Sequence, residues 1–179
     1  MRIIGGKNRG IRLAEVGKGD AAKHLRPTTD RVRETLFNIL NNHIDFENHI
    51  VLDLFAGTGA LGLEALSRGA KECLFVDDGR AAQKLLSQNI ERCEAAAKVI
   101  SQDATRVILP AGFEASLVFL DPPYGKDLVG KTLRHIAAHI EEDALIVCED
   151  NCPIAPPDGF KLRDQRQFGV TWITLLDAP

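Results

Sequence analysis

The sequence predicts an α/β protein whose strands form a mostly parallel sheet. From residue 50 to residue 148, short apolar runs alternate with amphipathic stretches of helical length. The apolar runs show little polar alternation, which is typical of strands buried on both faces of a parallel sheet. Two strand-like segments, 160–168 and 170–176, then follow each other with a turn at Phe168-Gly169-Val170, which favours a terminal antiparallel hairpin.

Length and composition limit what such a fold can contain. The chain has 179 residues, of which 45% are hydrophobic and 26% charged, and these values fit one compact domain that needs neither disulfides nor metal. No apolar run approaches the roughly 18 residues of a membrane helix, and the first residues lack the apolar core of a signal peptide. The four cysteines form no Cys-x-x-Cys pair. We therefore expect a cytoplasmic protein with reduced thiols and no membrane partner.

Charge is distributed unevenly along the chain. The net charge is only −3, but residues 1–38 contain nine lysines and arginines against four acids, a net charge of +5, so the remainder carries −8. A basic N-terminal region on an acidic body indicates a polyanionic partner. An ordinary solvated terminus would show the same charges, so the charge pattern alone leaves both interpretations open.

The N-terminal region, residues 1–27, is expected to form a small basic extension of a main domain that covers residues 28–179. Short apolar and basic segments at 2–4 and 10–13 lie around glycines and predict a β-hairpin, and residues 14–27 predict a loop. A helix is expected next, with Thr29 or Asp30 as its N-cap. Its apolar stripe consists of Val32, Leu36, Ile39 and Leu40. The residues expected off this stripe are Arg31, Arg33 and Glu34.

The elements of the main domain follow without an internal repeat. Strands are expected at 50–54, 73–76, 98–101, 117–120 and 144–148. Helices are expected at 60–68, 80–93 and 127–140.

A glycine-rich turn follows the first predicted strand. The segment Asp53-Leu54-Phe55-Ala56-Gly57-Thr58-Gly59-Ala60-Leu61-Gly62 contains Gly-x-Gly-x-x-Gly between a strand and a helix, which formally matches a dinucleotide fingerprint. Asp53 argues against a dinucleotide, because its carboxylate would repel a pyrophosphate and attract an ammonium group. The chain is also too short for the second domain of a dehydrogenase.

Acidic residues also follow the second and third predicted strands. Asp77 ends the second strand, where a carboxylate can accept hydrogen bonds from both hydroxyls of a ribose, and Asp78 is a competing candidate. Asp103-Ala104 follows the third strand, where the carboxylate could accept an adenine amino proton. Together with Asp53, these acids suit a ligand with an ammonium group, a ribose and an adenine. That ligand is S-adenosylmethionine.

The motif Asp121-Pro122-Pro123-Tyr124 follows the buried strand at 117–120. A proline-rich turn is the simple explanation, but the motif leaves the strand at the edge that holds the other acids. Asp121 and the Pro122 carbonyl can each accept an N–H bond from a planar amine, whose delocalised lone pair is a poor nucleophile. The prolines bring no competing amide donor, and the Tyr124 ring can stack on a base. The motif therefore predicts N-methylation in which positioning supplies most of the catalysis.

A metal site is the weaker alternative. His135 and His139 are four residues apart on a predicted helix, and Cys148 and Cys152 are also four apart. No third and fourth ligand clearly converge with either pair, so we expect no metal.

Several segments of the chain resemble those of one protein family. Arg2-Ile3-Ile4-Gly5-Gly6-Lys7 with Gly10, residues 25–38, residues 53–70 and residues 121–125 together resemble the bacterial RsmD-type methyltransferases, which modify guanine N2 in 16S ribosomal RNA. The glycine turn and the Asp-Pro-Pro-Tyr motif are shared by many methyltransferases, whereas the segment from Arg26 to Asn38 is distinctive of this family. Two positions depart from the family pattern: Asp77 stands where Glu is common, and Phe168 stands where Tyr is frequent.

The resemblance implies a Rossmann-like class I methyltransferase fold with a seven-stranded sheet, S-adenosylmethionine as cofactor, and a guanine amine of 16S ribosomal RNA in an assembling small subunit as substrate. It implies catalytic roles for Asp121, Pro122, Pro123 and Tyr124. The implied cofactor residues are Asp53, Gly57, Thr58, Gly59, Asp77, Asp103 and Ala104, with Arg26 and Thr28 in a loop that closes over the cofactor. There Arg26 would meet either the methionine carboxylate or the RNA. The residues expected to follow the RNA phosphates are Arg2, Lys7, Arg9, Arg12, Arg31 and Arg33.

Other functions share the same site chemistry. An Asp-Pro-Pro-Tyr enzyme could methylate adenine N6 or the side-chain amide of a protein glutamine. The basic N-terminal region favours RNA over these targets. A module that binds S-adenosylmethionine or RNA without catalysis is the alternative from another class, and the intact motif argues against it.

Overall fold

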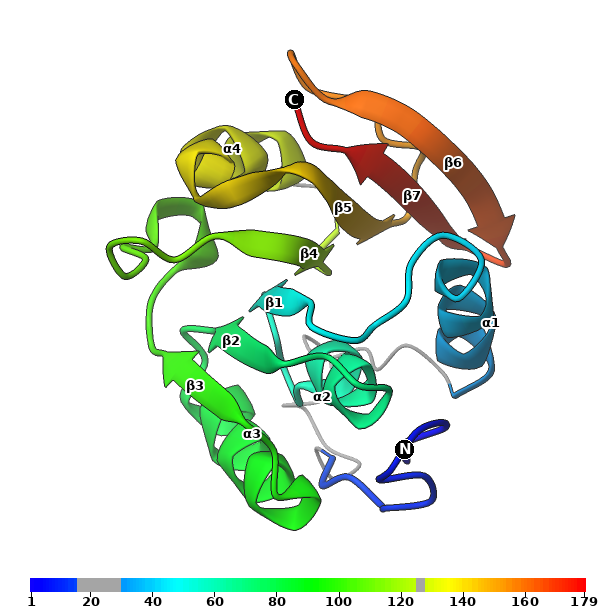
Figure 1. Cartoon of the computed structure of the whole chain (residues 1–179), viewed down its shortest axis with the longest axis vertical. Coiled ribbons are helices and arrows are strands. Elements are labelled where there is room, and N and C mark those ends of the chain that lie inside the picture. The colour runs from blue at the N-terminus through cyan, green and yellow to red at the C-terminus, as the bar shows by residue number, and fades with distance from the viewer. Residues whose placement is uncertain (16–29, 125–127) are drawn as a thin grey trace.

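The computed structural model describes residues 1–15, 30–124 and 128–179 of the chain. Seven strands form one sheet in the order β3-β2-β1-β4-β5-β7-β6 (Figure 1). The strands are β1 (Ile50–Leu54), β2 (Glu72–Val76), β3 (Ala97–Ile100), β4 (Ala115–Leu120), β5 (Ile140–Asp150), β6 (Lys161–Phe168) and β7 (Thr171–Asp177). Strands β1 to β5 pair in parallel, while β7 pairs antiparallel with both β5 and β6. The predicted parallel sheet with a terminal antiparallel hairpin is confirmed.

The main helices are α1 (Asp30–Leu40), α2 (Ala60–Ser67), α3 (Arg80–Cys93) and α4 (Leu128–Ile136). The described residues also include two short 3₁₀ turns, η2 (Ala104–Arg106) and η3 (Ala137–His139). The helix predicted over 127–140 is therefore too long. Ile140 already pairs with Ala115 as the first residue of β5, so the helix must end before it.

The sheet lies between two apolar layers because successive side chains of a strand point to opposite faces. Val51, Phe75 and Phe119 pack on the face that carries α1, α2 and α3. Leu52 and Val118 pack on the other face, with the apolar side of α4. Figure 1 shows the two helical layers on either side of the sheet. Burial on both faces explains why these strands have almost no polar residues.

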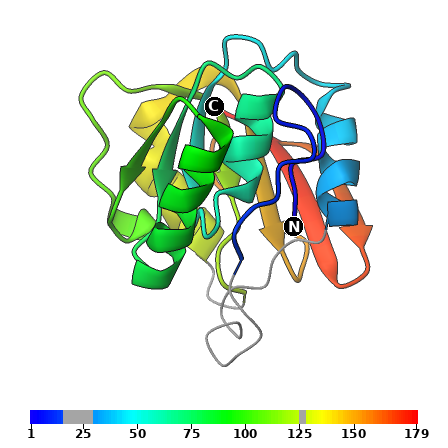
Figure 2. The same cartoon turned by 90° about the horizontal axis from the view of Figure 1, so that it is seen from below.

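The N-terminal arm, residues 1–15, packs against the ends of α2 and α3 (Figure 2). Ile3 and Leu13 are buried in the main core. Where the sequence predicts a hairpin, the arm contains one isolated antiparallel bridge, between Arg2 and Arg12. Residue 27, the predicted end of the extension, lies outside the described residues.

One residue of α1 departs from its predicted place. Leu36, Ile39 and Leu40 are buried as expected, but the side chain of Arg33 is 0% exposed as well. Arg33 stands one helical turn before Leu36 and so faces the same side as the apolar stripe. The expectation that Arg33 lies off the stripe and follows RNA phosphates is wrong, since its guanidinium cannot reach a ligand at the surface.

Candidate functional site

The carboxyl ends of the central strands bring the predicted acids to one edge of the sheet. Leu54 is aligned with both Val76 and Leu120, and Leu120 is aligned with Cys148. The residues that end or follow these strands therefore lie side by side. This is the edge at which open α/β sheets bind their ligands.

The glycine turn after β1 is tightly constrained by its neighbours. Gly59 has φ +77°, and a Cβ atom at this position would lie 2.4 Å from Leu86 Cδ1 of α3. A Cβ atom on Gly62 would lie 2.5 Å from Phe75 Cε1 of β2. The missing side chains therefore let α2 pack closely on the sheet and let the turn approach α3.

Asp53, near the end of β1, is hydrogen-bonded to the segment that follows this turn. Its side chain is only 2% exposed, and its Oδ2 accepts a hydrogen bond from the Gly62 amide at 2.9 Å. Burial raises the pKa of Asp53 to about 8, against the lowering effect of that hydrogen bond and with a further rise from the nearby Asp77 charge. A carboxyl group in this state would gain charge if a cation were bound beside it.

Asp77 connects the turn to the start of α3. Its Oδ2 accepts a hydrogen bond from the Gly57 amide and its Oδ1 accepts one from the Gly79 amide, both at 2.8 Å. Burial raises the pKa of Asp77, while the two amide hydrogen bonds oppose this rise. Asp78 is exposed. Of the two candidates for a ribose, Asp77 is thus the one that contacts the glycine turn.

Asp103 is already occupied by local contacts. It is the N-cap of η2, where its Oδ1 accepts hydrogen bonds from the Thr105 amide at 2.9 Å and the Thr105 hydroxyl at 2.8 Å. Its Oδ2 lies 3.2 Å from Arg106 Nε. These hydrogen bonds hold the pKa of Asp103 below its usual value. Asp103 would have to accept a hydrogen bond from an adenine in addition to these contacts. The buried Ala104 belongs to the same turn.

The Asp-Pro-Pro-Tyr motif meets the end of β5. The Tyr124 hydroxyl donates a hydrogen bond to Glu149 Oε1 at 3.2 Å and lies 3.5 Å from Thr171 Oγ1. Burial raises the pKa of Tyr124 to about 12, so the hydroxyl stays protonated. Burial, followed by the charge of Glu149, raises the pKa of Asp121 well above its ordinary value. Pro122 is buried against this corner, and Pro123 is exposed.

Glu149 and Thr171 are site residues that the sequence reasoning missed. Glu149 follows the predicted strand 144–148 at the same edge as Asp121, so the rule that identified the other acids would have identified it too. Thr171 comes from the terminal hairpin, whose position beside the motif depends on the sheet order. Arg26 and Thr28 lie outside the described residues.

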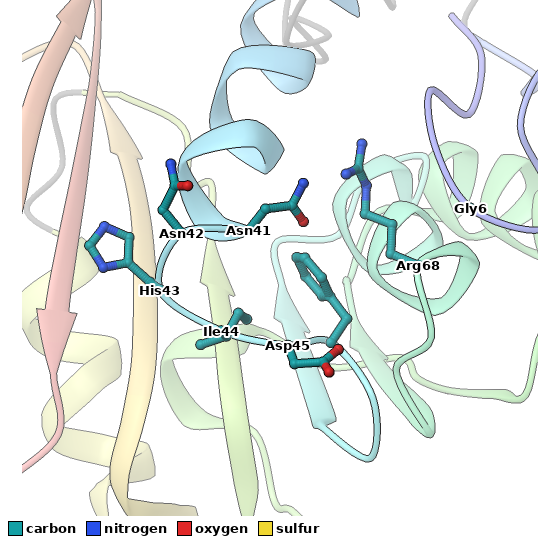
Figure 3. A pocket seen from close by; sticks show the side chains of 8 residues that line it. Gly6, Asn41, Asn42, His43, Ile44, Asp45 and Arg68 are labelled. Carbon is teal, nitrogen blue, oxygen red and sulfur yellow. The ribbon is translucent and has the colours of Figure 1, made fainter.

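A cavity of about 710 Å³ lies elsewhere, at the connection between α1 and β1 (Figure 3). It is lined by Gly6, Asn41, Asn42, His43, Ile44, Asp45, Phe46 and Arg68. None of these is a predicted site residue. We place the candidate site at the carboxyl edge because the converging carboxylates and the glycine turn lie there.

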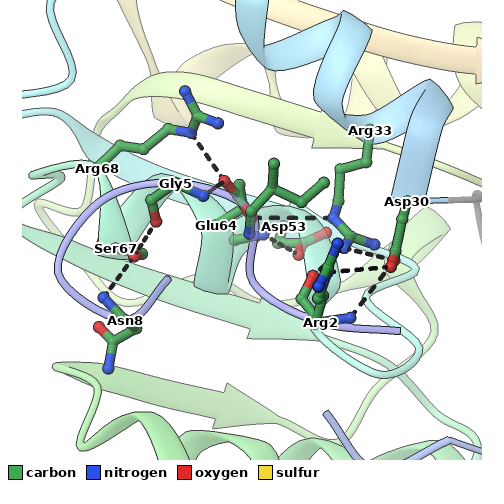
Figure 4. Close-up of polar contacts among 11 residues, drawn as sticks. Arg2, Gly5, Asn8, Asp30, Arg33, Asp53, Glu64, Ser67 and Arg68 are labelled. Atoms are coloured by element: carbon green, nitrogen blue, oxygen red, sulfur yellow. Dashed lines mark hydrogen bonds and ion pairs between the residues drawn. The ribbon is translucent and has the colours of Figure 1, made fainter. Parts of the chain in front are cut away.

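The exposed cations of the N-terminal arm are held on the protein by a buried polar cluster (Figure 4). Glu64 of α2 accepts hydrogen bonds from the amides of Ile4 and Gly5, both at 2.8 Å. The side chains of the four arm residues predicted to bind RNA, and of Arg31 on α1, are exposed. These arm residues are Arg2, Lys7, Arg9 and Arg12.

Within the described ranges, neither a metal site nor a membrane helix is found. No group of three or more His, Cys, Asp or Glu side chains is arranged to hold a metal ion. No helix in this part of the chain is long and apolar enough to cross a bilayer.

Comparison with known proteins identifies the family. A family model described as "Conserved hypothetical protein 95" matches residues 1–177. The chain belongs to this family. Ribosomal RNA small subunit methyltransferase D of Escherichia coli K12 is 40% identical over 152 residues, which cover 83% of this chain and 74% of that protein. The protein of the same name from Haemophilus influenzae is 33% identical over 179 residues, covering 95% and 90%.

Solved structures agree with this membership. The structure of yhhF from Escherichia coli superposes with a TM-score of 0.84 at 35% identity, covering 99% of this chain and 97% of that one. The ribosomal protein L11 methylase of Lactobacillus delbrueckii has a TM-score of 0.65 at 12% identity, covering 83% and 79%, and shares the fold alone. The resemblance to the RsmD-type family and the class I methyltransferase fold are both confirmed.

Proposed function

We propose that this methyltransferase transfers the methyl group of S-adenosylmethionine to the exocyclic N2 amine of a guanine in 16S ribosomal RNA. The observation that carries the proposal is the meeting of Asp121 and Tyr124 with Glu149 beside the glycine turn. The names of the relatives support the choice of ribosomal RNA.

The residues around the turn fit S-adenosylmethionine. When bound, this cofactor supplies an electrophilic methyl group carried by a sulfonium. Asp53 is a buried carboxyl group that would be stabilised in its charged form by the ammonium group of the ligand. Asp77 is the candidate for the ribose hydroxyls, and Asp103 with Ala104 for the adenine. The backbone of Gly57, Thr58 and Gly59 would face the ligand, with Arg26 and Thr28 as further expected contacts.

Asp121 is proposed to orient the target amine. As a carboxylate it accepts an N–H bond from the amine, and the Pro122 carbonyl can accept a second. Because proline has no amide hydrogen, Pro122 and Pro123 bring no donor that would compete for the Asp121 oxygens. Tyr124 is proposed to line the base pocket, and its hydrogen bond to Glu149 fixes the direction of the ring. As the N–C bond forms, the bond between the methyl carbon and the sulfonium sulfur breaks, and its electron pair stays on the sulfur. The amine nitrogen then loses one proton, for which Asp121 is the proposed acceptor.

The exposed cations of the N-terminal arm are proposed to bind RNA phosphates. Arg2, Lys7, Arg9 and Arg12 lie on the arm, and Arg31 follows on α1. The shape of the RNA, within an assembling small subunit in the cytoplasm, is proposed to supply much of the specificity.

The test is transfer of a tritiated methyl group to naked 16S ribosomal RNA, to small subunits and to DNA, followed by nucleoside analysis. We expect labelled N2-methylguanosine from ribosomal RNA and loss of at least 100-fold in rate for Asp121→Asn, with S-adenosylmethionine binding retained. Labelled N6-methyladenine or a labelled protein would replace the proposal by the corresponding alternative. Binding without any transfer would indicate a non-catalytic module.

A further inference from the structure

The side chain of Asn89 on α3 joins two segments that are far apart in the sequence. It is 0% exposed. Its Oδ1 accepts a hydrogen bond from the Ala14 amide at 2.6 Å, and its Nδ2 donates to the Ala14 carbonyl at 3.2 Å and to the Thr58 carbonyl at 2.9 Å. A buried side-chain amide is costly unless it is hydrogen-bonded, and asparagine is a poor helix former. An asparagine at position 89 is therefore explained by these three hydrogen bonds and not by a contribution to the stability of α3 itself.

The two partners of Asn89 belong to the two regions for which ligands are proposed. Thr58 lies between Gly57 and Gly59, so its carbonyl helps to set the orientation of the glycine turn. Ala14 lies near the end of the N-terminal arm, and both of its main-chain groups pair with Asn89 as they would with a neighbouring strand.

The last turn of α3 provides further anchors for the arm. Arg92 Nη1 donates to the Arg12 carbonyl at 3.1 Å, and Asn8 Nδ2 donates to the Cys93 carbonyl at 2.9 Å. At its other end α3 begins directly after Gly79, whose amide donates to Asp77. The helix thus contacts the cofactor side of the molecule at its start and the basic arm at its end.

We propose that Asn89 is a positioning residue that couples the glycine turn to the N-terminal arm, so that binding of the cofactor and binding of RNA strengthen each other. The inference rests on the proposed function, which puts the cofactor at the turn and RNA on the arm. The amide of Asn89 is planar, and one Nδ2 hydrogen is available for each of the two carbonyls. A shift of the Thr58 carbonyl on ligand binding must turn this plane and so change both bonds to Ala14. Linkage then requires an equal effect in the reverse direction.

The test compares the affinity for S-adenosylhomocysteine in the absence and in the presence of saturating 16S ribosomal RNA transcript. For the wild-type protein we expect an affinity about fivefold or more higher with RNA, a ratio typical of coupled sites. Asn89→Ala removes all three hydrogen bonds and should bring this ratio close to one. Asn89→Asp keeps an acceptor for the Ala14 amide but loses both donated bonds, and should also lower the ratio. Ser87→Ala is the control and should leave the ratio unchanged. Among the contacts described, the Ser87 hydroxyl bonds only to the Gln83 carbonyl one turn earlier on the same helix.

A second measurement needs no variant. Hydrogen exchange of the Ala14 amide in the wild-type protein should slow severalfold when S-adenosylhomocysteine binds, which a purely structural role of Asn89 does not predict. A wild-type affinity ratio of one, an unchanged ratio in Asn89→Ala, or an Ala14 exchange rate that ignores the ligand would each overturn the coupling. These results differ from failure of the proposed function, in which RNA or S-adenosylhomocysteine would not bind at all.

Discussion

Arg33 and Glu64 form an ion pair inside the protein, with 3.9 Å between Nε and Oε2 and with both side chains 0% exposed (Figure 4). Glu64 also pairs with Arg68 at 2.9 Å and accepts the two amide hydrogen bonds of the arm. Arg33 donates to the Arg2 carbonyl and to Asp30. One carboxylate on α2 thus balances a buried cation on α1 and holds the N-terminal arm.

Glu64→Gln is expected to destabilise the protein strongly. The substitution keeps the shape of the side chain but removes the buried negative charge that pairs with Arg33 and Arg68. The Arg33 guanidinium then keeps only the partly exposed Asp30 carboxylate, 3.0 Å from Nη2, as a counter-charge among the described residues, within which its Nε and Nη1 have no hydrogen-bond partner. Breaking a buried pair in this way costs about 3–5 kcal/mol. Urea unfolding would measure the change. Asp164→Asn, which breaks the partly exposed pair with Arg166 on β6, is the control and should cost less than about 1 kcal/mol. If both substitutions lowered the free energy of unfolding by the same small amount, Glu64 would not be central to the cluster.

Arg33 also shows where sequence reasoning stops. Periodicity assigned α1 correctly from its apolar residues, but it treats every arginine as a surface residue. Arg33 is tolerated inside because two carboxylates face it, Asp30 on the same helix at 3.0 Å and Glu64, 31 residues later, at 3.9 Å. The pairing with Glu64 depends on how α1 and α2 pack. By contrast, β1, β2 and β4 could be predicted closely because burial on both faces leaves a continuous apolar run.

The candidate site was predictable in position and less so in its contacts. Acids at strand ends must meet at one edge of a parallel sheet, so Asp53, Asp77 and Asp121 could be located from the sequence. The contacts of Asp103 with Thr105 and Arg106 depend on a 3₁₀ turn that hydrophobic periodicity does not predict. The contact of Tyr124 with Glu149 required the pairing of β4 with β5.

Glu149→Gln is expected to move the acidic limb of the pH–activity profile to lower pH. In the proposed function Asp121 is the acceptor for the target amine, so activity should rise as this carboxyl group loses its proton. Burial and the charge of Glu149 raise the pKa of Asp121, and removal of that charge should lower it. The measurement is kcat/KM for methyl transfer at pH values from about 5 to about 9, the range in which carboxyl groups with a raised pKa titrate.

The control for this shift is Glu142→Gln, the same substitution at an exposed position of the same strand. It should leave the profile unchanged. A limb that stays in place in Glu149→Gln, or that moves to higher pH, would show that the Asp121–Glu149 repulsion does not govern the protonation state used in the reaction.

Charge reversal of Lys7 and Arg9 to Glu is expected to weaken RNA binding and to reduce its dependence on salt. Each phosphate contact that is lost reduces the slope of log affinity against log salt by about one. The affinity for a 16S ribosomal RNA transcript would be measured at several salt concentrations. Lys161→Glu, an exposed reversal on the edge strand β6, is the matched control. An unchanged slope in the double variant would remove this part of the arm from the RNA interface.

Binding of S-adenosylmethionine at pH 7 is expected to release protons. The pKa of Asp53 is raised to about 8 in the ligand-free protein, so at pH 7 this carboxyl group mostly carries its proton. An ammonium group nearby favours the carboxylate, lowers the pKa, and drives the proton into solution. Calorimetric titrations in buffers of different ionisation enthalpy would measure the number released. The release should fall at pH 9, where Asp53 is already ionised, and should decrease in Asp53→Asn but not in Asp78→Asn. Heats that do not depend on the buffer would mean that the cofactor ammonium group does not interact with Asp53.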